Sequence, residues 1–249
     1  MPPTKEQKRL AVDLKDGLLH AYDPEAVILF GSLGRGDADE FSDVDLFVVM
    51  ETDRDVKELS EEMAGYLDSI TKDKHIIVRT PRDFCRERDI PGTIVFSAVK
   101  DGQILFEKGD WQTRYLPVDS YRERKIEVIQ REYVRSAHDF LTQAESSLRG
   151  SHFFRCRDFA RFAAVRAIKG IFVKNDRHPP RELDLIDLLA LAKEMEPDLM
   201  EDLETMRELN GYCPGKADAV ERRRSRRMLD RTTRFVNKII AGYVAHVEV

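Results

Sequence analysis

The sequence predicts an α+β domain followed by an all-α domain. Short apolar runs rich in β-branched residues, typical of buried strands, occur only before about residue 115, whereas amphipathic helical periods continue to the end of the chain. The charge divides in the same place, because residues 1–116 hold 16 basic and 24 acidic residues and residues 117–249 hold 25 and 22. We therefore expect a mixed-sheet domain over residues 1–114 and a helical bundle over residues 115–249.

The elements of the first half follow from local patterns. Leu10, Leu14 and Leu18 are four residues apart and predict a helix over residues 5–20, which must end before Pro24. Apolar runs predict strands over residues 26–30, 44–50 and 75–78. Apolar residues four positions apart predict a helix over residues 55–70, between the second and third of these strands. Residues 93–107 predict a helix or strand, a turn at Asp101-Gly102 and a last short strand.

The second half consists of helical periods separated by glycine and proline. They cover residues 121–148, 153–174, 183–195, 198–210 and 221–246.

No apolar run approaches the ~20 residues of a membrane span, and the N-terminus has no apolar signal region, so we expect a soluble, cytoplasmic chain. Three scattered cysteines, Cys85, Cys156 and Cys213, predict neither a disulfide framework nor a thiolate zinc site.

The segment from Gly31 to Leu46 carries the chemistry. Asp43 and Asp45 are two positions apart at the start of a predicted strand, so their side chains share one face. Two carboxylates about 5 Å apart repel by roughly 3 kcal/mol at an effective dielectric of about 20, and a cation between them removes that cost. Oxygen ligands favour Mg²⁺, which also takes substrate phosphates as ligands.

Phosphate-binding groups precede this acidic pair. Gly31 and Ser32 directly follow the buried run AVILF, where glycine lets the backbone approach a ligand and a hydroxyl can donate to phosphate oxygens. Arg35 adds a guanidinium fork that matches phosphate geometry. The segment spells neither a Walker loop nor a G-x-G-x-x-G fingerprint.

The pattern G-S-x-x-R-G-x₅-S-D-x-D-L resembles the signature of the polymerase-β-like nucleotidyltransferase superfamily, in its minimal nucleotidyltransferase branch. Thr80-Pro81-Arg82-Asp83-Phe84 is similar to that branch's T-P-x-x-F, and the likeness spans about residues 25–108. The resemblance implies that Gly31 and Ser32 grip a nucleoside triphosphate, and that Asp43 and Asp45 bind two Mg²⁺ ions. It also implies that Arg35 and Ser42 support the phosphates or shape the loop.

One position departs from the family pattern. Members carry a third carboxylate on the strand before T-P, and the corresponding residue here is His75. A neutral imidazole can act as a general base, but it is a poor ligand for a hard ion. We therefore expect His75 to be a catalytic residue, with a strand histidine that only bonds the backbone as the alternative.

The second half resembles the HEPN domain, a helical module associated with such transferases. The likeness covers residues 161–172, 184–188 and 212–214. Nuclease members carry an R-x₄₋₆-H pair, and Arg131 with His138 fits this spacing but lies in the first helix rather than where the family keeps it. Ribonuclease activity is therefore not expected.

Together these features predict a Mg²⁺-dependent nucleotidyltransferase that moves a nucleoside monophosphate, AMP from ATP, to an acceptor hydroxyl. The layout is similar to that of antibiotic nucleotidyltransferases of the kanamycin kind, so the acceptor is either an aminoglycoside-like small molecule or a protein hydroxyl. The alternative, which His75 motivates, is a catalytically weak nucleotide-binding regulator or antitoxin-like module. A homodimer is a further expectation from related layouts.

The run Glu221-Arg222-Arg223-Arg224-Ser225-Arg226-Arg227 has two interpretations. Basic runs can bind nucleic acid, but no aromatic residues interleave with these arginines. Apolar residues continue at helical spacing after the run, so we interpret it as the solvated start of an amphipathic helix. With a net charge of −5 over the chain, a nucleic-acid partner is not expected.

Overall fold

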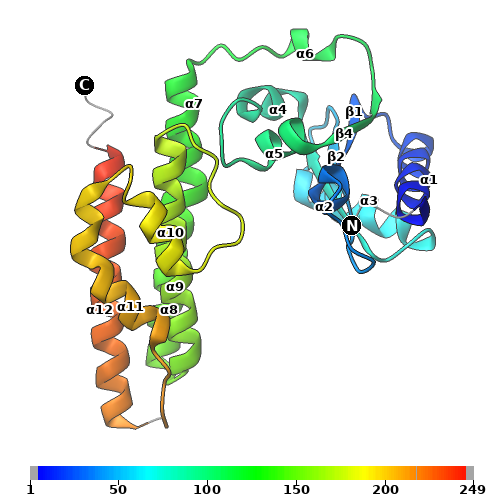
Figure 1. The fold of residues 1–249 in the computed structure, drawn as a ribbon. Helices are drawn as coiled ribbons and strands as arrows, with labels where there is room; N and C mark the ends of the chain where they lie inside the picture. Colours follow the sequence, from blue (N-terminus) through cyan, green and yellow to red (C-terminus); the bar gives the residue numbers. More distant parts are fainter. Residues whose placement is uncertain (1–4, 217, 245–249) are drawn as a thin grey trace. The chain divides into compact units, whose positions relative to one another are not determined.

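A four-stranded mixed sheet organises the first half of the chain in the computed structural model, which describes residues 5–216 and 218–244 (Figure 1). Its strands are β1 (Ala26–Phe30), β2 (Val44–Val49), β3 (Lys74–Arg79) and β4 (Gln103–Glu107), in the spatial order β3-β2-β1-β4. Strand β1 is antiparallel to β2 and β4, and β2 is parallel to β3. The predicted mixed sheet is confirmed, with each predicted strand placed to within about one residue at either end.

Helices cover both faces of the sheet because side chains alternate along each strand. On β2, Val44, Leu46 and Val48 belong to a core with α1 (Lys5–Ala21) and α3 (Val56–Tyr66). Phe47 and Val49 face the other way, into a core with α4 (Pro81–Glu87), α5 (Ile94–Asp101) and α6 (Trp111–Arg114). The sheet is therefore the middle layer of three.

A short helix that the sequence did not predict joins β1 to β2. This helix, α2 (Gly31–Arg35), begins directly at the end of β1 and ends at Gly36, whose φ of 83° lies in the left-handed region. The Gly36 N–H donates to the carbonyls of Ser32 and Leu33, as in common helix C-caps. The connection thus turns back within one helical turn.

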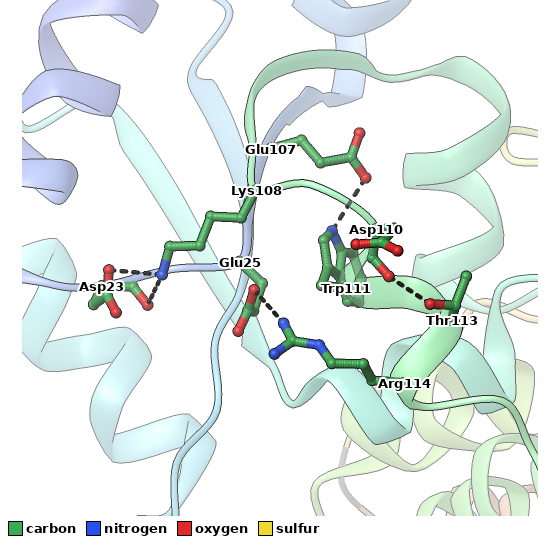
Figure 2. Close-up of polar contacts among 8 residues, drawn as sticks. All are labelled: Asp23, Glu25, Glu107, Lys108, Asp110, Trp111, Thr113 and Arg114. Carbon is green, nitrogen blue, oxygen red and sulfur yellow. Dashed lines mark hydrogen bonds and ion pairs between the residues drawn. The ribbon is translucent and has the colours of Figure 1, made fainter.

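The segment after β4 is held to the sheet by polar contacts (Figure 2). The Lys108 ammonium lies 2.6 Å from an Asp23 carboxylate oxygen, and an Arg114 guanidinium nitrogen lies 3.1 Å from Glu25. The Trp111 indole N–H donates to Glu107, and its ring, which is 2% exposed, packs in the core. Residues up to the end of α6 therefore belong to the first unit, and contacts divide the chain between Ser120 and Tyr121.

The second unit is a bundle built around α9 (Phe153–Lys174), which packs against α8 (Ser136–Arg149), α10 (Leu185–Ala192) and α12 (Ala219–Val244). A π-helical segment, η2 (Ile129–Arg135), joins α7 (Tyr121–Val128) to α8, so the predicted helix over 121–148 contains one wider turn. The 3₁₀ helix η3 (Pro197–Asp202) leads into α11 (Leu203–Gly211). The helical second half is confirmed, and residues 245–246 of the last predicted helix lie outside the described residues.

Among the described residues, no helix has both the length and the apolar character needed to cross a membrane.

Candidate active site

Asp45 lies at the centre of the candidate site, near the start of β2. It faces Phe30 of β1 on one side and His75 of β3 on the other in the sheet register. Its neighbours Val44 and Leu46 are buried on the opposite face, so the pleat directs Asp45 to the α4–α6 side. The Asp45 side chain is 25% exposed. Asp43 precedes β2 by one residue and is exposed.

The Asp45 carboxylate packs directly against the backbone of Gly31, where α2 begins. A Cβ atom at residue 31 would lie 1.9 Å from Asp45 Oδ2, which is far inside van der Waals contact. The φ angle of Gly31, 69°, is also in the left-handed region that side chains disfavour. Glycine is therefore required at position 31 for two reasons: a side chain would collide with the Asp45 carboxylate, and it would disfavour the backbone conformation.

His75 lies directly across from Asp45 on the parallel neighbour strand. Its Nδ1 is 3.6 Å from Asp45 Oδ1, a distance that is too long for a good hydrogen bond but close enough for an ion pair when the imidazole is protonated. The His75 side chain is 64% exposed. The residue in the position of the family's third carboxylate thus faces the acidic site.

The site concentrates negative charge in a partly buried place. Burial raises the pKa of the Asp45 carboxyl, and the charge of Asp43 raises it further. His75 and Arg35 act in the opposite direction, because both favour the ionised form. A carboxylate that is held at such a cost, beside a second one, is suited to binding a cation.

The loop between α2 and β2 is held by Ser42. Its hydroxyl donates to Asp39 Oδ1 over 2.7 Å and accepts the Asp39 N–H over 3.0 Å, and Asp39 Oδ1 also accepts the Phe41 N–H. The hydrogen bond from Ser42 lowers the pKa of Asp39. The geometry therefore favours the loop-shaping role of Ser42. Asp39 was not predicted, although Asp-x-x-Ser before a strand is a signal for such a turn.

The remaining predicted residues lie on α2. Ser32 is in its first turn, partly buried, and the N–H groups of a first turn have no acceptor within their own helix. Arg35 is in its last turn and its Nε is 3.0 Å from Asp37 Oδ2. Gln103 of β4 donates to the Gly34 carbonyl and fixes α2 to the sheet. The structure thus places Gly31 and His75 beside the Asp45 carboxylate. The positive charge of Arg35 lowers the pKa of Asp45.

The donor set fits Mg²⁺ that is shared with a substrate. Among the described residues, no three His, Cys, Asp or Glu side chains gather into a metal site. Mg²⁺ is commonly bound by one or two carboxylates, with waters and substrate phosphates completing its octahedron. Asp43 and Asp45 can supply that number of protein ligands.

Replacing Ser42 with alanine is expected to loosen the loop while both carboxylates of the predicted metal site remain. The Asp39 carboxylate and N–H would each lose one hydrogen bond. We expect a small decrease in the urea midpoint of unfolding, because these bonds are exposed to solvent, and weaker Mg²⁺-nucleotide binding. Ser42→Thr keeps the hydroxyl and should behave as the wild type; equal losses in both variants would contradict the role.

Comparison with known proteins gives a family match for each half of the chain. Residues 13–110 match the family described as polymerase beta, nucleotidyltransferase, and residues 130–240 match the HEPN domain. No curated protein matches the chain. One similar solved structure is a nucleotidyltransferase-like protein from Exiguobacterium sibiricum, with 10% identity over 97% of this chain and 79% of that one and a TM-score of 0.46. Another is a spectinomycin adenyltransferase from Enterococcus faecialis, solved with ATP and spectinomycin. It has 11% identity over 93% of this chain and 100% of that chain, and a TM-score of 0.43.

Proposed function

Because the chain carries a polymerase-β-type nucleotidyltransferase domain followed by a HEPN domain, we propose that it transfers a nucleoside monophosphate, AMP from ATP, to an acceptor hydroxyl. One observation carries the proposal: the Asp45 carboxylate packs on Gly31 at the start of α2, with Asp43 two residues before it. The start of a helix and a carboxylate with a second acidic residue nearby therefore lie together inside the matched family segment.

In this proposal, the chain positions the reactants and balances their charge. Asp43 and Asp45 would hold Mg²⁺, which when bound would supply charge neutralisation at the phosphates and activation of the acceptor oxygen. Gly31 lets the start of α2 lie directly against the Asp45 carboxylate, and Ser32 can donate its hydroxyl hydrogen to a phosphate oxygen. Arg35 contributes positive charge near the carboxylates, as its effect on Asp45 indicates. Catalysis of this kind consists mostly of alignment and electrostatic stabilisation.

We propose that His75 accepts the proton of the acceptor hydroxyl. It faces Asp45 from β3, its side chain is largely open to solvent, and a neutral imidazole is a competent base near neutral pH. Replacing His75 with alanine is expected to lower kcat by about 10²-fold or more, the usual contribution of a general base, with little change in the Kd for ATP. The measurement is pyrophosphate release from ATP and Mg²⁺ with acceptor present.

The matched variants separate catalysis from structure. His75→Gln keeps similar bulk but cannot accept the proton, so it should be as slow as His75→Ala, whereas His75→Asp should recover part of the rate because it places a carboxylate in the family's position. A wild-type rate in His75→Gln would show that His75 is only a strand residue.

A second candidate function is a nucleotide-binding regulator with little or no catalysis. The observation that favours it is the imidazole itself, because a nitrogen ligand opposite Asp45 supports Mg²⁺ poorly. A wild-type chain that binds labelled ATP but releases no pyrophosphate with aminoglycosides, other small alcohols or protein acceptors would favour this candidate. Substituting GTP, CTP and UTP in the same assay identifies the preferred base.

A further inference from the structure

The first turns of α12 carry a dense array of arginines that the proposed transfer reaction does not use. Six of the ten residues from Arg222 to Arg231 are arginines. At 1.5 Å rise per residue they extend over about 14 Å of helix. Several lie three or four residues apart, where like charges repel by about 0.2–0.5 kcal/mol per pair. Such an array destabilises the isolated helix.

A groove between α11 and α12 concentrates part of this array. Its volume is about 510 Å³, within the range of ligand sites. The two helices lie side by side in Figure 1 and pack in the same unit. The charged and aromatic side chains that line it are Arg207, Glu208, Tyr212, Arg224, Arg227 and Arg231. Four guanidinium groups thus face one carboxylate.

A second hollow, of about 460 Å³, adjoins the first. It is lined by Arg222, Arg223, Arg226 and Arg227, with Leu148 from α8. Arg227 lines both hollows, so they form one basic surface that crosses α12, from α11 on one side to α8 on the other. We call this surface the arginine groove.

The positive charge of the arginine groove is only partly neutralised within the protein. Glu208 lies 2.5 Å from Arg231, and Glu145 lies 2.9 Å from Arg226. Among the described side chains, no acidic group lies within ion-pair distance of Arg207, Arg223 or Arg227. Acidic partners are therefore fewer than the guanidinium groups, and several of these remain available to an outside anion.

The groove offers no surface for base stacking. Tyr212 is 5% exposed, its hydroxyl donates to Glu221 and lies 2.7 Å from the Ser225 hydroxyl, and the Arg224 guanidinium covers its ring at 4.8 Å from the centroid. Burial raises the pKa of Tyr212 to about 12, so the hydroxyl stays protonated. Tyr212 therefore serves as a platform that orients Arg224, and recognition rests on guanidinium groups alone.

We propose that the arginine groove binds a chain of phosphate groups, the backbone of a single-stranded nucleic acid. Guanidinium forks match phosphate oxygens in pairs, and an array that crosses two hollows suits several successive phosphates rather than one. Without aromatic stacking or base-edge contacts, binding is independent of sequence and depends strongly on salt. The groove belongs to the second unit, whereas Asp43 and Asp45 belong to the first, so the proposal stands whether or not nucleotidyl transfer occurs.

The test measures binding of a fluorescein-labelled twelve-residue oligouridylate to the full chain by fluorescence anisotropy, at several salt concentrations. EDTA in the buffer prevents metal-dependent binding at the acidic pair. We expect Arg207→Gln/Arg227→Gln to weaken binding at least about tenfold and to reduce the slope of log K against log salt by about 0.7 for each phosphate that the variant no longer neutralises. Arg227→Lys keeps the charge without the fork and should lie between wild type and the double variant.

The control variant is Arg135→Gln, an arginine of the same unit that lines neither hollow. It should bind within about twofold of the wild type, and thermal melts verify that every variant folds. Absence of oligouridylate binding, or equal losses in the control and groove variants, would overturn the proposal. Inorganic tripolyphosphate is then added at an equal concentration of phosphate groups. If it displaces the oligouridylate, the nucleic-acid backbone is overturned as the natural source of the phosphates; if the oligouridylate stays bound, that source is supported.

Discussion

Replacing Asp45 with asparagine is expected to lower nucleotidyl transfer by about 10³-fold or more while the protein remains folded. The amide keeps the shape of the carboxylate, so its packing on Gly31 is preserved. It carries no charge, however, and a metal site of this kind contributes several kcal/mol to the transition state. The measurement is Mg²⁺-dependent pyrophosphate release from ATP. Asp53→Asn, which changes the charge equally at an exposed position, should retain the wild-type rate.

The same substitution should not lower stability. The pKa of Asp45 is raised in the folded state, mainly by burial, so its folded form favours the protonated carboxyl. The contribution of Asp45 to the free energy of unfolding is therefore fully present below its pKa in the unfolded chain, and it is lost as the pH rises through its pKa in the folded protein. At pH 7 the ionised carboxylate opposes folding. We expect Asp45→Asn to melt at an equal or higher temperature at pH 7 without metal. Mg²⁺ with a non-hydrolysable ATP analogue should raise the Tm of the wild type only. The assigned role of Asp45 would be contradicted if Asp45→Asn had a lower Tm than the wild type and if Mg²⁺ with the ATP analogue raised both Tm values equally.

The features that the sequence predicted well are those that depend on neighbouring residues alone. The apolar runs of β1 and β2 locate both strands, and the alternation of side chains places Asp45 and Phe47 on one face of β2. The break at Pro24 and the glycine after Phe30 give the ends of the first helix and strand. In each case the physical cause lies within a few residues, so the pattern is visible in the chain.

The features that the sequence could not predict depend on register and on packing between distant segments. His75 was assigned by counting from Thr80, but its position across from Asp45 follows only from the parallel pairing of β2 with β3. The start of α2 against Asp45 similarly depends on pairing between β1 and β2. The interpretation of the arginine run as the solvated start of an amphipathic helix is confirmed by α12. The groove that part of the run lines could not be predicted, because Arg207 is contributed by a different helix and only packing brings it there.

Replacing Gly31 with alanine is expected to destabilise the first unit by about 3 kcal/mol. The left-handed backbone costs about 1–2 kcal/mol for a residue with a side chain, and the collision with Asp45 Oδ2 adds an overpacking cost of about 1–3 kcal/mol. Activity should also fall, because the carboxylate must move from its position to admit the methyl group. Urea unfolding of the full chain measures the loss. Gly65→Ala is the matched control, since a Cβ there meets no atom within 4 Å and the position lies in helix α3, where alanine is expected to be neutral or stabilising.

A double-mutant cycle separates the two causes. In an Asp45→Ala background the colliding oxygen and Cγ are gone, and the closest remaining atom of residue 45, its Cβ, is 3.1 Å from the new Cβ. The cost of Gly31→Ala should then fall to about 1–2 kcal/mol, which is the backbone strain alone, and leave a coupling of about 1–2 kcal/mol between the positions. Equal costs in both backgrounds would show that the carboxylate does not rest on Gly31 in solution. Because both variants are compared by unfolding, the cycle tests the geometry of the site even if the chain has no transferase activity.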